Sequence, residues 1–241
     1  VDTWATNVQG SVNLLEAVRR QSSVRAVVMV TTDKVYEDSD STVPHRESDR
    51  LGGHDPYSSS KAAVELLSSS YRQSYWFSQG GEVSLATARA GNVIGGGDWG
   101  TDRLVPDCLR AFGDGRPVVL RSPMSVRPWQ HVLEPLSGYI VLAERLMGSE
   151  GQDVASAWNF GPVLGDEASV ADLAEMVAAA WGDGAEVVDD PDSGQIRETA
   201  ILRLDSSRAR NLLGWSPRWG LMEAVDRTVD WNRELSTGSD M

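Results

Sequence analysis

The sequence predicts an α/β protein built on a doubly wound parallel sheet. Two short runs, "VRAVVMV" at residues 24–30 and "VSLATARA" at residues 83–90, are mostly apolar and rich in valine and alanine. That pattern is typical of strands buried on both faces of a parallel sheet. A stretch with helical periodicity comes before each run, and alternation of helices with buried strands indicates βα units.

The two helices of this part each have a sequence signal of their own. Between residues 6 and 20, the apolar residues recur at the spacing of an amphipathic helix: Val12, Leu14, Leu15 and Val18. A second helix is expected to begin at Pro56 with Asp55 as its N-cap. Proline at the first helical position and aspartate just before it are both typical of helix starts.

Beyond residue 100 the pattern changes to helices separated by loops rich in proline and arginine. Helices are expected at residues 104–112, 132–147, 169–181, 206–213 and 220–234, with short strands in "SAWNFG" and at residues 200–204. Residues 236–241 are expected to form a disordered tail.

Composition and charge restrict the classes of function. The 241 residues carry a formal net charge of −13, one cysteine and three histidines. An acidic surface repels nucleic acid and anionic membranes, and the few cysteines and histidines lack zinc-site spacing, so no metal site is expected. No apolar stretch approaches the ~20 residues that span a bilayer. We therefore expect a cytoplasmic enzyme with neither nucleic acid nor membrane as a partner.

Asp33 and Lys34 form the first candidate site, because they follow a predicted strand at its carboxyl end, where open α/β sheets bind ligands. Lys34 is one of two lysines in the chain, beside twenty arginines. Burial or neighbouring charge can lower the pKa of a lysine until it serves as a base, whereas arginine stays charged. An aspartate with a raised pKa can act as a general acid. A solvated Asp–Lys turn is the alternative.

Tyr57 and Lys61, the other lysine, form a second candidate pair. Four residues apart at the start of a helix, they share one face. An ammonium group near a phenol lowers the pKa of the phenol toward a value useful for a base. The alternative is a chance pair on an exposed helix.

Loop residues after the second strand offer a third group of candidates. The glycines at 95–97 are interpreted as a loop that lets the backbone approach a ligand, with a plain surface loop as the alternative. Arg103 and Arg127 stand outside helical patterns, and their guanidinium groups suit a diphosphate. A surface ion pair is the alternative for each.

Several longer segments together resemble the extended short-chain dehydrogenase/reductase family of NAD-dependent epimerases and dehydratases. They are "TNVQGSVNLLEAVR", "TTDK", "YSSSK", "RAGNVIG" and "LDSSRARNLLGWSPRWGL", and the resemblance covers essentially residues 1–232. It implies that residues 1–100 are the C-terminal part of an NAD-binding, Rossmann-like domain. Residues 101–235 would mainly form a smaller α/β substrate-binding domain, with residues 125–161 returning to the first. The family's glycine-rich dinucleotide turn precedes the helix that opens this chain, so we expect an N-terminally truncated sequence.

The resemblance also implies a reaction. "DPYSSSKAAVELL" and "SVRPWQHVLEPLSGYIVLAERL" are similar to the branch that removes water from nucleotide-sugars, and a lysine at 34, where dTDP-glucose enzymes have glutamate, favours CDP-glucose. In the implied 4,6-dehydration, Tyr57 assisted by Lys61 takes the 4-hydroxyl proton while NAD takes a hydride from C4. Lys34 then removes the C5 proton, Asp33 protonates the departing 6-hydroxyl, and the hydride returns to C6.

Other residues receive roles from their place in the matching motifs. Thr32 is expected to bond the sugar 4-hydroxyl, and Thr6, Tyr57 and Lys61 to face NAD. The remaining residues expected in the nucleotide-sugar pocket are Asn92, Arg103, Leu104, Arg127, Asn159 and Glu198, with Arg127 on the diphosphate.

Two alternatives stay open at this point. Another nucleotide-sugar epimerase or dehydratase would share the fold, and an epimerase would need Tyr57 and Lys61 but not Asp33 and Lys34. An inactive truncated fragment would bind ligand without turnover. Family members commonly dimerise through a helix bundle, so the resemblance implies a homodimer formed by the helices at 6–20 and 57–76.

Overall fold

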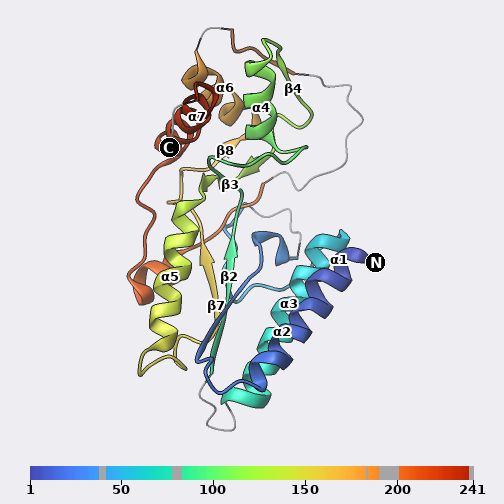
Figure 1. The fold of residues 1–241 in the computed structure, drawn as a ribbon, viewed down its shortest axis with the longest axis vertical. Helices are drawn as coiled ribbons and strands as arrows, with labels where there is room; N and C mark the ends of the chain where they lie inside the picture. Colours follow the sequence, from blue (N-terminus) through green and yellow to red (C-terminus); the bar gives the residue numbers. More distant parts are fainter. Residues whose placement is uncertain (38–41, 78–82, 183, 190–200, 239–241) are drawn as a thin grey trace.

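The central layer of the protein is a three-stranded parallel sheet. The computed structural model describes residues 1–37, 42–77, 83–182, 184–189 and 201–238. The strands lie in the order β1-β2-β7, with bounds Ala26–Val30, Ser84–Ala90 and Ala157–Phe160. Figure 1 shows helices on both faces of this sheet, α5 on one side and α1 to α3 on the other. The predicted doubly wound α/β fold is therefore confirmed.

The helices of one face begin and end close to their predicted bounds. Helix α1 (Asp2–Trp4), the π-helical turn η1 (Ala5–Gln9) and α2 (Gly10–Arg19) follow one another where a helix was expected at residues 6–20. Helix α3 (Pro56–Tyr71) continues into a second π-helical turn, η3 (Arg72–Phe77). The carboxylate of Asp55 accepts hydrogen bonds from the backbone N–H groups of Tyr57 at 2.8 Å and Ser58 at 3.1 Å, which confirms the predicted cap.

The opposite face is covered by α5 (Leu133–Met147), which packs closely on β7. A Cβ atom added to Gly138 would lie 2.3 Å from the ring of Phe160, so only glycine allows this close approach. Phe160 and Leu142 are completely buried here, and each contributes about 1.5–3 kcal/mol by leaving water. The sheet is thereby held in a fixed position under the loops that follow its strands.

A second hydrophobic cluster lies beyond the carboxyl ends of the sheet. Three helices, α4 (Leu104–Gly113), α6 (Val170–Trp181) and α7 (Leu221–Ser236), pack together with the parallel pair β4 (Val118–Leu120) and β9 (Val187–Asp189). Short paired strands connect this part to the sheet: β3 (Val93–Ile94) with β6 (Gln130–His131), and β5 (Val126–Arg127) with β8 (Ala168–Ser169). Figure 1 shows this part above the sheet and the C-terminus beside α7.

The C-terminal part of the chain matches its sequence expectations in some segments and differs in others. A strand at residues 200–204 was expected, but the described residues there form only isolated bridges, from Ile201 to Val126 and from Leu204 to His45. The expected helix at residues 206–213 is present and includes the π-helical turn η4 (Ala209–Leu213). Helix α7 ends at Ser236, inside the expected tail, and residues 239–241 lie outside the described residues. The division into residues 1–100 and 101–235 stays a prediction.

Candidate active site

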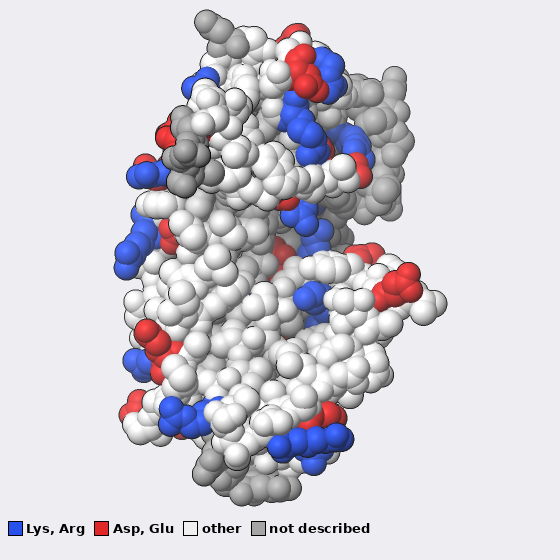
Figure 2. Space-filling view, viewed as in Figure 1, with Lys and Arg blue, Asp and Glu red and all other residues white. Residues whose placement is uncertain are grey.

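A cavity of about 520 Å³ opens at the carboxyl ends of β1 and β2, under the helices of the second cluster. This is the position at which open α/β sheets bind ligands, and the volume suits a small molecule. On the face drawn in Figure 2, basic side chains gather along the hollow between the two parts of the molecule. The cavity brings together eight residues predicted from the sequence: Thr32, Asp33, Lys34, Tyr57, Asn92, Arg103, Leu104 and Arg127.

The turn after β1 presents three of these residues in sequence. It is a single 3₁₀ turn, η2 (Asp33–Val35), preceded by Thr32 in extended conformation. The hydroxyl of Thr32 accepts a hydrogen bond from the backbone N–H of Lys34 at 3.3 Å and donates one to Oδ1 of Asp33 at 3.1 Å. The threonine therefore caps the turn and orients the aspartate.

Asp33 is the buried member of the Asp33–Lys34 pair. It is 2% exposed, and Oδ2 has no hydrogen-bond partner among the described residues. Burial raises the pKa of this carboxyl to about 6, although the hydrogen bond from Thr32 and the positive charges of Lys34 and Arg127 act in the opposite direction. Near neutral pH the group is thus close to its titration point, as a general acid requires.

Lys34 is exposed, and within the described part of the chain its ammonium group has no hydrogen bond or ion pair. The burial that we expected at the lysine is found instead at its neighbour Asp33. Burial raises the pKa of Asp55, the N-cap of α3, but hydrogen bonds from Ser58 and Tyr57, together with the nearby charge of Lys34, lower it overall. A ligand in the cavity has an unengaged amine beside a buried carboxyl.

Tyr57 and Lys61 share one side of α3, as their spacing predicted, but they do not interact as expected. Burial raises the pKa of Tyr57, with the carboxylates of Asp33 and Asp55 adding to the effect and a hydrogen bond with Thr32 opposing it. The sequence had indicated a lowered pKa, caused by Lys61. Instead the Lys61 ammonium donates to the carbonyl of Val30 at 3.2 Å, and burial lowers its own pKa.

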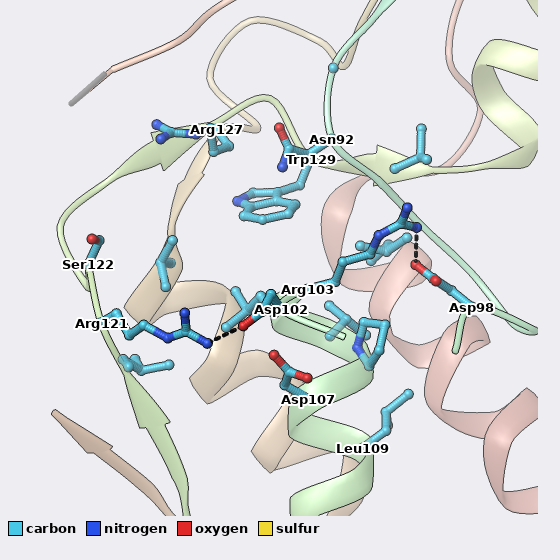
Figure 3. A pocket seen from close by; sticks show the side chains of 18 of the residues that line it. Asn92, Asp98, Asp102, Arg103, Asp107, Leu109, Arg121, Ser122, Arg127 and Trp129 are labelled. Atoms are coloured by element: carbon cyan, nitrogen blue, oxygen red, sulfur yellow. Dashed lines mark hydrogen bonds and ion pairs between the residues drawn. The ribbon is translucent and has the colours of Figure 1, made fainter. Parts of the chain in front are cut away.

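The walls of the cavity carry arginines from three separate elements. Arg103 comes just before α4, Arg121 follows β4 and Arg127 lies in β5. Figure 3 shows Arg103 pointing toward Asp98, and Arg121 toward Asp102. Arg127 is 5% exposed and donates to the carbonyl of Val126 at 2.9 Å. Three guanidinium groups thus line one cavity of an acidic chain, and two of them are paired with aspartates that also line it.

Among the residues that the structure describes, three predicted site residues lie outside the cavity lining. Lys61 lies one helical turn after Tyr57 on α3, and Thr6 lies exposed on η1. Asn159 was expected to line the pocket, but it is fully buried in β7, where its amide accepts from the hydroxyl of Tyr36 at 2.6 Å and donates to the carbonyl of His45 at 3.0 Å. The structure therefore does not bring Asn159 to the cavity. Glu198 falls outside the described residues.

Several lining residues were missed by the sequence reasoning, above all Arg121, Trp129 and the aspartates that pair with the arginines. Burial alternates along β4, so that Val119 is exposed between buried Val118 and Leu120. Arg121 lies one residue beyond β4 and so on the same side as Val119, but the continuously apolar sequence of the strand gave no signal that could have identified it. No sequence signal indicated Trp129 either. In the structure its indole N–H donates to the carbonyl of Ala168 at 3.1 Å.

The glycine loop between β3 and α4 contributes to the wall without forming a dinucleotide-binding turn. Gly95, Gly97 and Gly100 have the Gly-x-Gly-x-x-Gly spacing. However, the loop follows a two-residue strand outside the main sheet, and α4 begins only at Leu104. A Cβ atom added to Gly96 would lie 2.2 Å from the ring of Trp231, so this glycine permits close packing on α7.

The described residues offer neither a membrane-spanning helix nor a metal-binding cluster. No helix within the described ranges has both the length and the apolar composition needed to cross a bilayer. Among the residues that the structure places, no three His, Cys, Asp or Glu side chains are grouped so as to hold a metal ion.

Comparison with known proteins gives consistent results over the whole chain. The model of the NAD dependent epimerase/dehydratase family matches residues 1–156. A CDP-glucose 4,6-dehydratase of Salmonella typhimurium is 46% identical over 245 residues, which include 100% of this chain and 67% of that protein. A dTDP-glucose 4,6-dehydratase of Streptomyces antibioticus is 30% identical over 95% of this chain and 63% of its own length.

Solved structures agree with the fold. A dTDP-glucose 4,6-dehydratase of Streptomyces venezuelae, crystallised with NAD, superposes with a TM-score of 0.77 at 26% identity, over 98% of this chain and 68% of that one. The chain thus spans about two thirds of the length of the relatives that it matches.

Proposed function

The chain belongs to the NAD dependent epimerase/dehydratase family, and we propose that it is a nucleotide-sugar 4,6-dehydratase that converts CDP-glucose to CDP-4-keto-6-deoxyglucose. This reaction makes the protein a hydro-lyase. Support comes from the 46% identity to a CDP-glucose 4,6-dehydratase and from a cavity that combines arginines with an acid–base pair.

One observation carries the proposal beyond family membership. Oδ2 of Asp33 is buried at the cavity, has no hydrogen-bond partner among the described residues, and belongs to a carboxyl whose pKa burial raises to about 6. A buried, unpaired polar atom is costly unless a ligand satisfies it. A protonated carboxyl there is suited to give its proton to a departing hydroxyl group.

The redox part of the reaction is assigned to Tyr57 and Lys61. NAD, when bound, supplies the hydride acceptor for C4 and the hydride donor for C6, and is regenerated in each turnover. Lys61 fits the nicotinamide end of this cofactor because its ammonium has one hydrogen bond in the described structure, to Val30, and keeps further N–H donors for ribose hydroxyls. Asn7 donates to Ser60 at 2.9 Å, which holds η1, with the exposed Thr6, against α3.

Tyr57 would take the proton of the sugar 4-hydroxyl group as the C4–H bond of the sugar breaks. The phenol is 44% exposed at the cavity, with Thr32 beside it as the partner for the same sugar hydroxyl. Because burial and two carboxylates raise the pKa of Tyr57, we expect the positive charge of bound NAD and Lys61 to counteract them.

The elimination is assigned to Asp33 and Lys34. A ketone at C4 acidifies the C5 hydrogen, so the amine of Lys34 can remove that proton. The C5–H electrons form the C5–C6 double bond as the C6–O bond breaks, and Asp33 protonates the departing oxygen so that it leaves as water. Asp33 then holds a negative charge and Lys34 a positive one, and the pair recovers by exchanging protons with water.

The arginines would hold the diphosphate of the substrate. Arg103 and Arg127 approach the cavity from different elements, and a diphosphate offers oxygens to both. The choice of cytosine as the base is supported by the identity to the Salmonella protein and by the lysine at 34, which the resemblance associates with CDP-glucose.

The homodimer and the cytoplasmic location remain predictions. Leu14 of α2 is 50% exposed and Leu66 of α3 is 63% exposed, and an exposed apolar pair on these two helices supports their proposed role in a dimer.

The test is turnover of three substrates in parallel. The chain is incubated with NAD and CDP-glucose, dTDP-glucose or UDP-glucose, and 4-ketosugar is followed by its absorbance in alkali. The proposal expects ketosugar from CDP-glucose and much less from the other two. A product that is only the 4-epimer would favour the epimerase alternative, and absence of ketosugar with all three would contradict the proposed activity.

A further inference from the structure

A buried ion pair lies beneath the cavity without lining it. Glu65 of α3 and Arg89 of β2 are 3% and 4% exposed in their side chains. Two parallel hydrogen bonds join them, Nε to Oε1 at 2.9 Å and Nη2 to Oε2 at 2.8 Å. A buried ion pair is often no more stabilising than apolar residues of the same volume, so its use here calls for a role other than stability.

The carboxylate of Glu65 ties the helix of the redox pair to both neighbouring strands. Glu65 lies one helical turn after Lys61 and, besides Arg89, accepts hydrogen bonds from the hydroxyl of Thr31 at 2.5 Å and of Thr87 at 2.7 Å. Burial alone would raise the pKa of Glu65, but the Arg89 guanidinium and the two hydroxyl groups lower it below its usual value. The group therefore remains an anion that holds three donors.

The guanidinium of Arg89 extends the same network to the other side of the η2 turn. Its Nη1 donates to the hydroxyl of Tyr36 at 2.9 Å, and Tyr36 donates to Asn159 at 2.6 Å. Tyr36 is the residue directly after η2, whereas Thr31 stands two residues before it. One ion pair thus anchors the segment that carries Asp33 and Lys34 at both of its ends.

We propose that Glu65 and Arg89, through Thr31 and Tyr36, are positioning residues that fix the spacing between the redox pair and the elimination pair. The inference rests on the proposed function, because a dehydratase must act at C4 with Tyr57 and then at C5 and C6 with Lys34 and Asp33 of the same sugar. A shift of about 1 Å between groups that act on one substrate reduces rates strongly. The network connects the two elements that must keep that distance.

The variants for the test leave the ion pair in place. Thr31→Val and Tyr36→Phe each remove one hydroxyl group, and Thr31→Ser restores the hydroxyl at residue 31. Removing Glu65 or Arg89 would leave a buried charge without its partner and endanger folding. Two matched controls lie away from the cavity: Tyr71→Phe, which loses a hydrogen bond to Glu16, and Thr228→Val, which loses one to the carbonyl of Ala224.

Local hydrogen exchange and steady-state kinetics test whether the network positions the turn. Hydrogen exchange at the amides of residues 32–35 is expected to accelerate about tenfold in Thr31→Val and Tyr36→Phe, with exchange in α7 unchanged. For CDP-glucose dehydration, kcat is expected to fall about tenfold, because the reacting groups lose their alignment. KM should stay near the wild-type value, because the contacts that bind the substrate remain. Thr31→Ser should restore both quantities, and the controls should change neither.

Wild-type exchange at residues 32–35 in both variants would overturn the proposal. So would faster exchange spread evenly over the chain in step with a lower Tm, or a loss expressed only in KM. The exchange measurement needs no turnover, so a chain that makes no ketosugar contradicts the proposed function alone, and local exchange still decides whether the network anchors the turn.

Discussion

A Cβ atom added to Gly91 would lie 3.1 Å from Oδ2 of Asp33, which places the unpaired oxygen of the buried carboxyl directly against the loop that follows β2. Both residues line the cavity. The acid proposed for water elimination is therefore confined between the ends of two adjacent strands, and this confinement raises its pKa.

Replacing Asp33 by asparagine should change stability in a pH-dependent way. The pKa of Asp33 is raised from 3.8 to about 6, so its favourable contribution is complete below about pH 4 and is lost as pH rises through 6. Above pH 7 the ionised carboxylate costs up to about 3 kcal/mol. Asp33→Asn is therefore expected to have a higher Tm than wild type near pH 8, and no such advantage near pH 4.

Asp205 provides the control of opposite sign. Burial raises the pKa of Asp205, but the hydrogen bonds from Ser207 and the ion pair with Arg46 lower it by more, so the pKa is lowered overall. Asp205→Asn should therefore lose Tm near pH 8 and lose progressively less as the pH falls. Equal changes in Tm at both pH values for Asp33→Asn would contradict the assigned burial effect.

Two substitutions at Lys34 separate its charge from its ability to accept a proton. Lys34→Met removes both, and Lys34→Arg keeps only the charge, because arginine does not deprotonate in proteins. Both should lose ketosugar formation by at least about 100-fold, as expected for a missing general base. Lys34 is exposed and its ammonium group has no hydrogen bond in the described structure, so Tm should remain unchanged. Full activity of Lys34→Arg would show that the lysine acts only as a charge.

Gly91→Ala should damage the cavity wall. The new Cβ would lie 2.5 Å from Cγ of Pro128 and 2.9 Å from its carbonyl oxygen, so backbone must shift. We expect a loss of about 1–3 kcal/mol in the free energy of unfolding, as for other overpacked sites, together with slower dehydration. Gly113→Ala is the control, because nothing lies within 4 Å of its added Cβ. Urea unfolding of both variants checks this prediction, which equal stabilities would contradict.

Arg103→Gln should weaken binding of the nucleotide without affecting stability. The Arg103 side chain is 64% exposed, and its ion pair with Asp98 at 2.9 Å lies at the cavity. Loss of a guanidinium contact to a diphosphate is expected to raise the Kd for CDP about tenfold, or ~1.4 kcal/mol. Arg116→Gln is matched in exposure, at 64%, and lies outside the cavity lining. Calorimetric titration showing the same Kd for both variants would remove Arg103 from the site.

Much of the fold could be predicted from local pattern. The buried strands, the Asp55–Pro56 helix start and most helix bounds follow from periodicity and capping, which act within a few residues. The strand expected at residues 200–204 did not form, because Ile201 and Leu204 bridge to different segments. Such pairing depends on tertiary neighbours that the local sequence does not specify.

The candidate site was predicted in part for the same physical reason. Residues at the ends of strands, such as Asp33, have positions set by topology. The direction of the Tyr57 pKa was wrong, because it depends on burial and on Asp33 and Asp55, which tertiary structure brings near. Two charged residues gave signals that could have been used: Glu65 in "AAVELL" and Arg89 in "SLATARA" are single charges in largely apolar segments. Each indicates a partner, since buried charges are paired.

Isotope labelling of the product shows whether this chain, with Asp33 and Lys34 at its cavity, acts as a dehydratase. Wild-type chain and NAD are incubated with CDP-glucose in deuterium oxide, and the product is analysed by mass spectrometry and NMR. We predict a CDP-sugar that has lost one water molecule, with a ketone at C4, solvent deuterium at C5 and the original C4 hydrogen at C6. A product of unchanged composition, either recovered CDP-glucose or its 4-epimer, would contradict dehydratase activity.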